Sequence, residues 1–170
     1  MNKGFEVIEA HWLFGYPLDQ IQVVMHSESI VHSLVEFADG TIKAQLGIPD
    51  MRLPIQYALT YPDRWAGPAS VSDFSAITQL SFEAMDIERF PCLSLALEAA
   101  QAGGTYPAVL SAADEVAVSR FLAGECSFPE IYRQVAGALE HHQPIYSPSV
   151  EEILDADRWA SHYLTQGLGV

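Results

Sequence analysis

Apolar residues recur at helical spacing in the first fourteen residues of the chain, where Phe5, Ile8 and Trp12 lie near one face of a helix. Acidic residues stand early in this segment, where the positive end of the helix dipole favours them. Gly15 follows the last periodic residue and is typical of a helix end. The pattern therefore predicts one amphipathic helix over residues 2–14.

Short segments rich in β-branched and apolar residues come next, and this composition is typical of strands. The segments are Ile21–Met25, Ile30–Phe37 and Thr41–Leu46. Asp39-Gly40 between the last two is a strong hairpin signal. A short helix is expected at residues 54–59, so this part of the chain predicts a mixed α and β structure.

Residues 61–89 show no sustained period and contain Pro62, Gly67 and Pro68. Long connections without a repeating pattern are typical of surface segments between domains. The sequence therefore predicts a linker there, with a domain boundary inside it.

The rest of the chain is helical in pattern from Pro91, a residue suited to the first turn of a helix. Two capping-box patterns, Ser127 with Glu130 and Ser149 with Glu152, indicate further helix starts. The apolar stripes expected to form the core are Leu110, Ala113, Ala117 and Phe121; Ile131, Val135 and Leu139; and Ile153, Ala156, Ala160 and Leu164. Helices with short connections predict a four-helix bundle in this part of the chain, and the fold class is therefore α+β.

Charge narrows the range of partners. Eight Lys and Arg residues stand against 22 Asp and Glu, a formal charge of −14, which would repel nucleic acid and an anionic membrane surface. No basic leader precedes an apolar stretch, and no run approaches the roughly 20 apolar residues of a membrane span. A cytoplasmic protein with neither nucleic acid nor membrane as partner is expected.

Cys92 and Cys126 are too few for a disulfide framework and are expected to be buried, reduced thiols.

The first candidate site is Asn2-Lys3-Gly4-Phe5-Glu6, at the start of the first predicted helix. Free backbone N–H groups, the Asn2 amide and the Lys3 ammonium can bind phosphate oxygens there. Gly4 would let the backbone approach closely, and Glu6 on the same face could bind a metal ion. The alternative is structural: Asn2 caps the helix, and Lys3 pairs with Glu6 at the surface.

A second polar cluster lies between two predicted strands, His26-Ser27-Glu28-Ser29 with His32 and Ser33. Its histidines are either substrate contacts or hydrogen-bonded structural residues. A metal-dependent hydrolase built on them is a poor reading, because their spacing is no zinc signature and no carboxylate stands at zincin spacing.

Two weaker candidates have structural explanations. In the turn Pro49-Asp50-Met51-Arg52, the Asp and Arg could pair while Met51 fills a gap in the core. The doublet His141-His142 is expected to cap the end of a helix.

Several motifs, in this order, resemble the 1-deoxy-D-xylulose 5-phosphate reductoisomerase family of non-mevalonate isoprenoid biosynthesis. They are Asn-Lys-Gly-Phe-Glu-Val-Ile-Glu-Ala at 2–10, the segment His26–Ser33, Gln-Leu-Gly-Ile-Pro-Asp-Met-Arg at 45–52 and Glu-Arg-Phe-Pro-Cys-Leu at 88–93. The resemblance implies the C-terminal part of that enzyme. Residues 1–60 would finish its catalytic α/β domain, 61–90 would form a linker, and 91–170 would form its C-terminal α-helical domain.

The resemblance also implies roles for individual residues. Glu6 matches one of three carboxylates that hold a divalent metal, Mg²⁺ or Mn²⁺, and so is a catalytic residue. Asn2 and Lys3 match residues that bind the substrate phosphate.

The second cluster and the following turn are implied in substrate binding as well. Ser29 matches a serine near the metal-chelating end of the substrate, and His32 matches a histidine close to the site. Pro49 and Met51 match residues that line the same pocket.

The implied reaction rearranges 1-deoxy-D-xylulose 5-phosphate and reduces the product with NADPH to 2-C-methyl-D-erythritol 4-phosphate. NADPH would be bound mainly by an N-terminal domain absent from this sequence, which has neither a Gly-rich dinucleotide motif nor the Asp-Ser-Glu motif of the other two metal carboxylates. This chain alone is therefore expected to be inactive, and a homodimer is expected through its sheet region. The alternative is a stand-alone, non-catalytic phosphate-binding or dimerisation module derived from that enzyme.

The chain departs from the family pattern at two places. Ser27-Glu28 stand where Pro-Gln is common, and Ser111-Ala-Ala-Asp-Glu115 stand where Asn-Ala-Ala-Asn-Glu is usual. The extra carboxylate of Glu28 is expected to weaken anion binding nearby.

Overall fold

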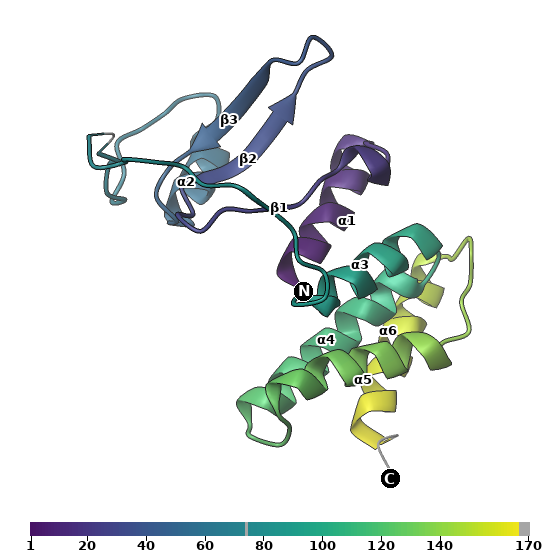
Figure 1. Cartoon of the computed structure of the whole chain (residues 1–170). Helices are drawn as coiled ribbons and strands as arrows, with labels where there is room; N and C mark the ends of the chain where they lie inside the picture. The colour runs from purple at the N-terminus through teal and green to yellow at the C-terminus, as the bar shows by residue number, and fades with distance from the viewer. Residues whose placement is uncertain (74, 167–170) are drawn as a thin grey trace. The chain divides into compact units, whose positions relative to one another are not determined.

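The computed structural model of the chain describes residues 1–73 and 75–166. Its helices are α1 (Asn2–Phe14), α2 (Arg52–Thr60), α3 (Pro91–Ala102), α4 (Tyr106–Leu122), α5 (Phe128–His141) and α6 (Val150–Gln166), with one 3-10 turn, η1 (Leu18–Gln20). Its strands are β1 (Val24–Met25), β2 (Val31–Glu36), β3 (Ile42–Leu46) and β4 (Glu83–Ala84). The described residues thus form a mixed structure of helices and small antiparallel sheets, which confirms the predicted α+β class (Figure 1). Within them, no helix combines the length and apolarity needed to cross a membrane.

Contacts between residues divide the chain into two compact units. One unit joins Met1–Val23 with the chain from Asp86 onward, and the other is Val24–Met85. This grouping differs from the predicted boundaries because α1 packs on α3, and because β4, inside the predicted linker, pairs with β1. The division into catalytic part, linker and helical domain stays a prediction.

The first unit is helical, and its core lies among α3, α4, α5 and α6. α4 contacts each of the other three, and Figure 1 shows α5 and α6 lying against it. Its fully buried side chains include Leu110, Val135 and Leu164. The predicted stripes face this core except at Ile153, which is 38% exposed because it lies in the first turn of α6, before the first buried residue, Ala156.

Both helix starts predicted from capping boxes are confirmed. The Ser127 N–H donates to the Glu130 carboxylate at 2.6 Å, and the Ser149 N–H donates to the Glu152 carboxylate at 2.7 Å. These bonds satisfy donors that a helix start otherwise leaves unpaired.

The two histidines of the 141–142 doublet have different roles. His141 lies 2.8 Å from the carbonyl oxygen of Gly137, one turn back, as expected for a cap. His142 instead places Nε2 2.6 Å from the hydroxyl of the buried Thr105, and so ties the α5–α6 connection to the start of α4. His142 does occupy the C-cap position of α5, but its side chain bonds to Thr105, 37 residues away in the sequence, and to no carbonyl of the helix end.

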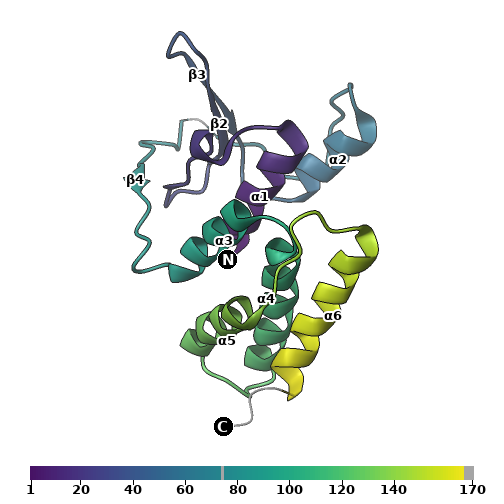
Figure 2. The same ribbon diagram turned by 90° about the vertical axis from the view of Figure 1, so that its right-hand side faces the viewer.

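α1 packs closely on α3 (Figure 2) because Gly4 has no side chain. A Cβ atom at Gly4 would lie 2.2 Å from the Cβ of Ala96, far inside van der Waals contact. Gly4 and Val7 are the buried residues of α1. The sequence suggested Gly4 as a point of close approach for a phosphate, whereas its missing side chain makes room for α3.

Replacing Gly4 by alanine is expected to lower the free energy of unfolding by about 1 kcal/mol, because overpacking a tight contact costs roughly 1–3 kcal/mol and outweighs a helix-propensity gain of about 1 kcal/mol. Gly137→Ala is the matched control. Gly137 lies inside α5, and a Cβ atom there would meet the Tyr163 hydroxyl at an ordinary 3.8 Å. That control should gain stability. Urea unfolding followed by far-UV circular dichroism compares them, and a stabilising Gly4→Ala would contradict the packing role.

The second unit contains two short antiparallel ladders. β2 and β3 form the predicted hairpin, and Gly40 in its turn has a positive φ of 81°. Leu34 faces Ala44 across this ladder. The strand predicted over residues 21–25 shrinks to the two residues of β1, because its partner β4 offers only two residues to pair with.

Asp114 in α4 has a buried Oδ1 that finds no hydrogen-bond partner among the described residues. Burial raises the pKa of this carboxyl. Burial also raises the pKa of the nearby Cys92 thiol, and the charge of Asp114 raises it further. Cys92 and Cys126 are free, as expected, but half-buried instead of fully buried.

Asp114→Asn is expected to raise the free energy of unfolding by about 1 kcal/mol at neutral pH, because it replaces a half-buried carboxylate, whose charge is costly to remove from water, with a neutral amide of the same shape. The folded pKa lies above the unfolded value of 3.8, so the contribution of Asp114 to stability is present below that value and is lost as the pH rises through the folded pKa. The gain should therefore shrink in acid. Thermal unfolding across pH tests this, and an equal gain at every pH would exclude the charge as its cause.

Candidate functional site

The start of α1 carries three of the predicted site residues. Asn2 Nδ2 donates to Glu6 Oε1 at 2.9 Å, and Lys3 Nζ donates to Glu6 Oε2 at 2.7 Å. The three side chains meet because residues three and four positions apart share a helix face. The surface pair of Lys3 with Glu6 is therefore present, but Asn2 is no cap, since Met1 occupies the cap position.

The side chains of this cluster are suited to binding an anion beside a metal cation. The first N–H groups of a helix have no partner inside the helix, and the positive end of the dipole adds to the charge of Lys3. The side chains of Lys3 and Glu6 are 60% and 44% exposed, so both can be reached from solvent. An anion that took the donors of Asn2 and Lys3 would release both carboxylate oxygens of Glu6.

Glu6 offers the type of ligand that a hard divalent cation prefers, but it offers too few ligands to hold the ion. Mg²⁺ and Mn²⁺ prefer carboxylate oxygens, and Mg²⁺ takes about six ligands. Residues 1–73 and 75–166 contain no group of three or more His, Cys, Asp or Glu side chains that could hold a metal ion. In this part of the chain, Glu6 could supply one ligand but not a complete metal site.

Ser29 is exposed and lies in the turn between β1 and β2 with φ of 51°, in the left-handed region. The turn is fixed by His26, whose Nδ1 lies 2.8 Å from the carbonyl oxygen of Ser81. His26 Nε2 accepts the N–H of Ile30 at 3.1 Å. Of the two readings for His26, these bonds favour the structural one.

His32 and the following turn are linked through the backbone of Gly47. His32 Nε2 lies 3.1 Å from the Gly47 carbonyl oxygen, to which it donates. Pro49 and Met51 follow this glycine and are exposed, Met51 by 71%. Met51 therefore fills no gap in the core, and its side chain is free to contact a bound molecule.

The pairing of Asp50 with Arg52 is confirmed. Arg52 Nε donates to Asp50 Oδ1 at 2.9 Å, and Nη2 donates to Oδ2 at 2.5 Å. Hydrogen bonding from Arg52 lowers the pKa of Asp50 to about 2. The pair fixes the turn at the start of α2 and with it the position of Met51.

The predicted residues fall into two sets. The first unit holds Asn2, Lys3 and Glu6 together, and the second holds Ser29, His32, Pro49 and Met51. The sequence did not predict a contact between Glu28 and Ser81. The Ser81 N–H donates to both Glu28 carboxylate oxygens at 3.2 Å. They are 53 positions apart, so no local pattern indicates their contact.

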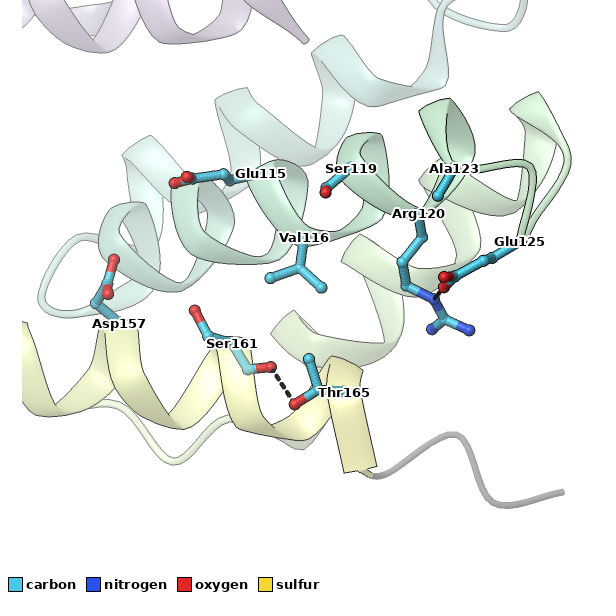
Figure 3. A pocket seen from close by; sticks show the side chains of 9 residues that line it. All are labelled: Glu115, Val116, Ser119, Arg120, Ala123, Glu125, Asp157, Ser161 and Thr165. Atoms are coloured by element: carbon cyan, nitrogen blue, oxygen red, sulfur yellow. Dashed lines mark hydrogen bonds and ion pairs between the residues drawn. The ribbon is translucent and has the colours of Figure 1, made fainter.

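Figure 3 shows a groove of about 560 Å³ between α4 and α6, lined by the nine residues labelled there. Arg120 in this groove already has partners. Its Nη1 donates to Gln134 Oε1 at 3.2 Å and to the Leu164 carbonyl oxygen at 3.1 Å, and its Nε lies 3.5 Å from Glu125 Oε2. Because these contacts occupy Arg120 and no predicted site residue lines the groove, we assign the groove a structural role.

Comparison with known proteins agrees with the resemblance read from the motifs. The DXP reductoisomerase C-terminal domain, as a family model, matches residues 46–163. The 1-deoxy-D-xylulose 5-phosphate reductoisomerase of Symbiobacterium thermophilum is 57% identical over 160 residues, which cover 94% of this chain and 41% of that protein. That of Exiguobacterium sibiricum is 55% identical over 165 residues, covering 96% and 43% respectively. The chain thus spans about two fifths of the length of the curated relatives it matches.

Solved structures give the same result. The reductoisomerase from Zymomonas mobilis in complex with NADPH superimposes with a TM-score of 0.90 at 42% identity, over 99% of this chain and 45% of that one. A DOX-P reductoisomerase in complex with NADPH, fosmidomycin and magnesium superimposes with a TM-score of 0.90 at 39% identity, over 96% of this chain and 42% of that one. On the strength of the domain match, the sequence identities and the superpositions, this chain belongs to the 1-deoxy-D-xylulose 5-phosphate reductoisomerase family and contains that family's C-terminal domain.

Proposed function

We propose that this chain supplies the C-terminal part of a reductoisomerase that converts 1-deoxy-D-xylulose 5-phosphate to 2-C-methyl-D-erythritol 4-phosphate with NADPH and a divalent metal. The observation that carries the proposal is the cluster of Asn2, Lys3 and Glu6 at the start of α1, in a chain of this family. It places anion donors and a carboxylate within one side-chain length of each other, as a phosphorylated, metal-chelating substrate requires.

Each residue of the cluster has a chemical role in this proposal. Asn2 and Lys3 bind phosphate oxygens by direct and charge-assisted hydrogen bonds, helped by the helix dipole. Glu6 contributes one carboxylate to the Mg²⁺ or Mn²⁺ site. The ion, when bound, polarises the substrate carbonyl. Phosphate binding frees Glu6 from its two neighbours, so substrate and metal binding are coupled at this helix start.

Four residues of the second unit also have substrate-binding roles in this proposal. Ser29 and His32 bind the part of the substrate that chelates the metal. Pro49 and Met51 cover its carbon chain, for which an exposed thioether and a proline ring are suited. Residues 1–60 belong to the catalytic domain, 61–90 to a linker and 91–170 to a C-terminal four-helix domain.

We propose that the chain has no turnover by itself, because Glu6 is the single carboxylate that the proposal assigns to the metal in residues 1–73 and 75–166, and the sequence contains no dinucleotide motif. An N-terminal, NADPH-binding part of the reductoisomerase is the partner. Exposed apolar side chains at the end of α1, Trp12, Leu13 and Phe14, support further protein packing there. Together the two parts make a cytoplasmic enzyme.

A homodimer is part of the proposal as well. The β2–β3 hairpin exposes Leu34, Val35 and Ile42. Its sheet has two strands within the described residues, and both outer edges could pair with a second copy. Leu34→Asp is expected to shift the chain toward monomer in sedimentation velocity, whereas a monomeric unmodified chain at high concentration would exclude pairing through this hairpin.

Isothermal titration of the substrate in the presence of Mg²⁺ tests the shared site. The chain should bind only when co-expressed with the part of the Symbiobacterium thermophilum relative that it does not match. Lys3→Ala should weaken this binding at least about tenfold through loss of a charge-assisted bond, and Lys43→Ala, a lysine on β3, should leave it unchanged. Binding of inorganic phosphate by the chain alone would instead favour the alternative, a stand-alone phosphate-binding module.

A further inference from the structure

We propose that His26 and Glu28 are positioning residues that hold Ser29 in its left-handed conformation. They form a clasp that ties the turn at residues 26–30 to Ser81 and Phe82, which directly precede β4. The proposal rests on the proposed function, because it gives Ser29 its substrate-binding role. It adds two residues that act through Ser29 and not by touching the substrate.

His26 holds the turn from both ring nitrogens. Because Nε2 accepts the N–H of Ile30 at 3.1 Å, it carries no proton, and the proton of the neutral ring lies on Nδ1. Nδ1 then donates to the carbonyl oxygen of Ser81 at 2.8 Å. The ring also stacks on Phe82 with centroids 4.7 Å apart, and its side chain is only 6% exposed. His26 is thus fixed in position, tautomer and orientation.

Glu28 completes the clasp. Both of its carboxylate oxygens accept the Ser81 N–H at 3.2 Å, and Oε2 lies 3.1 Å from His26 Nδ1. The hydrogen bonds from Ser81 lower the pKa of Glu28, so the carboxylate is ionised at neutral pH. Ser81 is therefore held through its N–H by Glu28 and through its carbonyl by His26. β1 and β4 pair directly beside this point, at Met25 and Glu83.

Ser29 needs such a clasp. A residue with a Cβ at φ of 51° is strained, and such conformations persist only where the surroundings enforce them. The N–H of Ser29 donates to the His26 carbonyl at 3.2 Å, and the next residue, Ile30, is bonded to the His26 ring. Without these bonds the turn would relax to negative φ, and the Ser29 hydroxyl would point elsewhere. The geometry therefore makes the hydroxyl direction of Ser29 depend on His26 and Glu28.

Matched variants separate the clasp from mere folding. His26→Phe keeps a ring that can stack on Phe82 but loses both hydrogen bonds. Glu28→Ala removes the acceptors for Ser81, whereas Glu28→Gln keeps one, so Gln should rescue what Ala loses. Hydrogen exchange on the 170-residue chain should show the Ile30 amide exchanging at least about tenfold faster in His26→Phe, with the amides of the β2–β3 ladder unchanged.

The second readout is the kinetics of the co-expressed pair. KM for the substrate should rise about tenfold in His26→Phe and Glu28→Ala with kcat nearly unchanged, and should return in Glu28→Gln. A loss of folded protein would lower the active fraction and thus kcat instead. Unchanged Ile30 exchange, or unchanged KM in both variants, would overturn the positioning role. An inactive unmodified pair would overturn the proposed function and Ser29's substrate role with it, and the exchange result would still decide whether the clasp exists.

Discussion

Replacing Glu6 by glutamine is expected to lower kcat of the co-expressed pair by about 100-fold or more, since a charged group that stabilises transition-state charge contributes several kcal/mol. Glutamine keeps the length of the side chain and one oxygen that can accept from Asn2 or Lys3, so α1 should stay intact. What is lost is the negative charge offered to the metal. The measurement is NADPH oxidation at saturating substrate and Mg²⁺.

Glu9→Gln is the control for that variant. Glu9 is an exposed acid of the same helix, one turn further on, and carries no role in the proposal. It should change kcat less than about twofold, as expected of a surface substitution away from the site. Equal losses in the two variants would show that helix charge, and not metal binding, is responsible. No loss in Glu6→Gln would remove Glu6 from the metal site.

Arg120→Ala is expected to lower the free energy of unfolding by about 3 kcal/mol, because hydrogen bonds to a charged group contribute about 1.5–3 kcal/mol each. The substitution leaves two buried acceptors without their donor, the side-chain oxygen of Gln134 on α5 and the backbone oxygen of Leu164 on α6. Gln134 and Leu164 are 7% and 1% exposed, so water replaces the guanidinium poorly there. Arg120 thus fastens α5 and the last turn of α6 to α4.

Urea unfolding by far-UV circular dichroism measures this loss, with Arg133→Ala as the matched control. Arg133 is an exposed arginine of α5, and its removal should change stability by less than about 0.5 kcal/mol. Similar effects in the two variants would mean that Arg120 acts only through the net charge of an acidic protein.

Local sequence patterns predicted helix starts and turns correctly where the residues that determine them are close together in the sequence. The capping boxes at Ser127 and Ser149 mark real helix starts, because cap and acceptor are three residues apart. The turn at Gly40 fixed the hairpin for the same reason, since a positive φ is a property of the turn residues themselves.

Contacts between distant residues could not be predicted in this way. The packing of α1 on α3 depends on Gly4 and Ala96, and the role of His142 depends on Thr105. No periodicity connects such pairs, so the sequence assigned Gly4 to a phosphate and did not indicate the bond between His142 and Thr105.

The candidate site also combines contacts between sequence neighbours with contacts between distant residues. Asn2, Lys3 and Glu6 could be grouped from the sequence, since helical spacing brings them onto one face. The contact of Glu28 with Ser81 spans 53 positions, so Glu28 was read only as an extra negative charge. In the structure that charge is used to hold a backbone N–H.

Turnover by the assembled protein decides whether this chain is part of a working reductoisomerase. The chain is assayed for oxidation of NADPH with 1-deoxy-D-xylulose 5-phosphate and Mg²⁺, alone and co-expressed with the unmatched part of the Symbiobacterium thermophilum relative. We expect turnover by the pair and none by either part alone. Turnover by this chain alone, or a folded pair that binds NADPH but leaves the substrate unchanged, would contradict it.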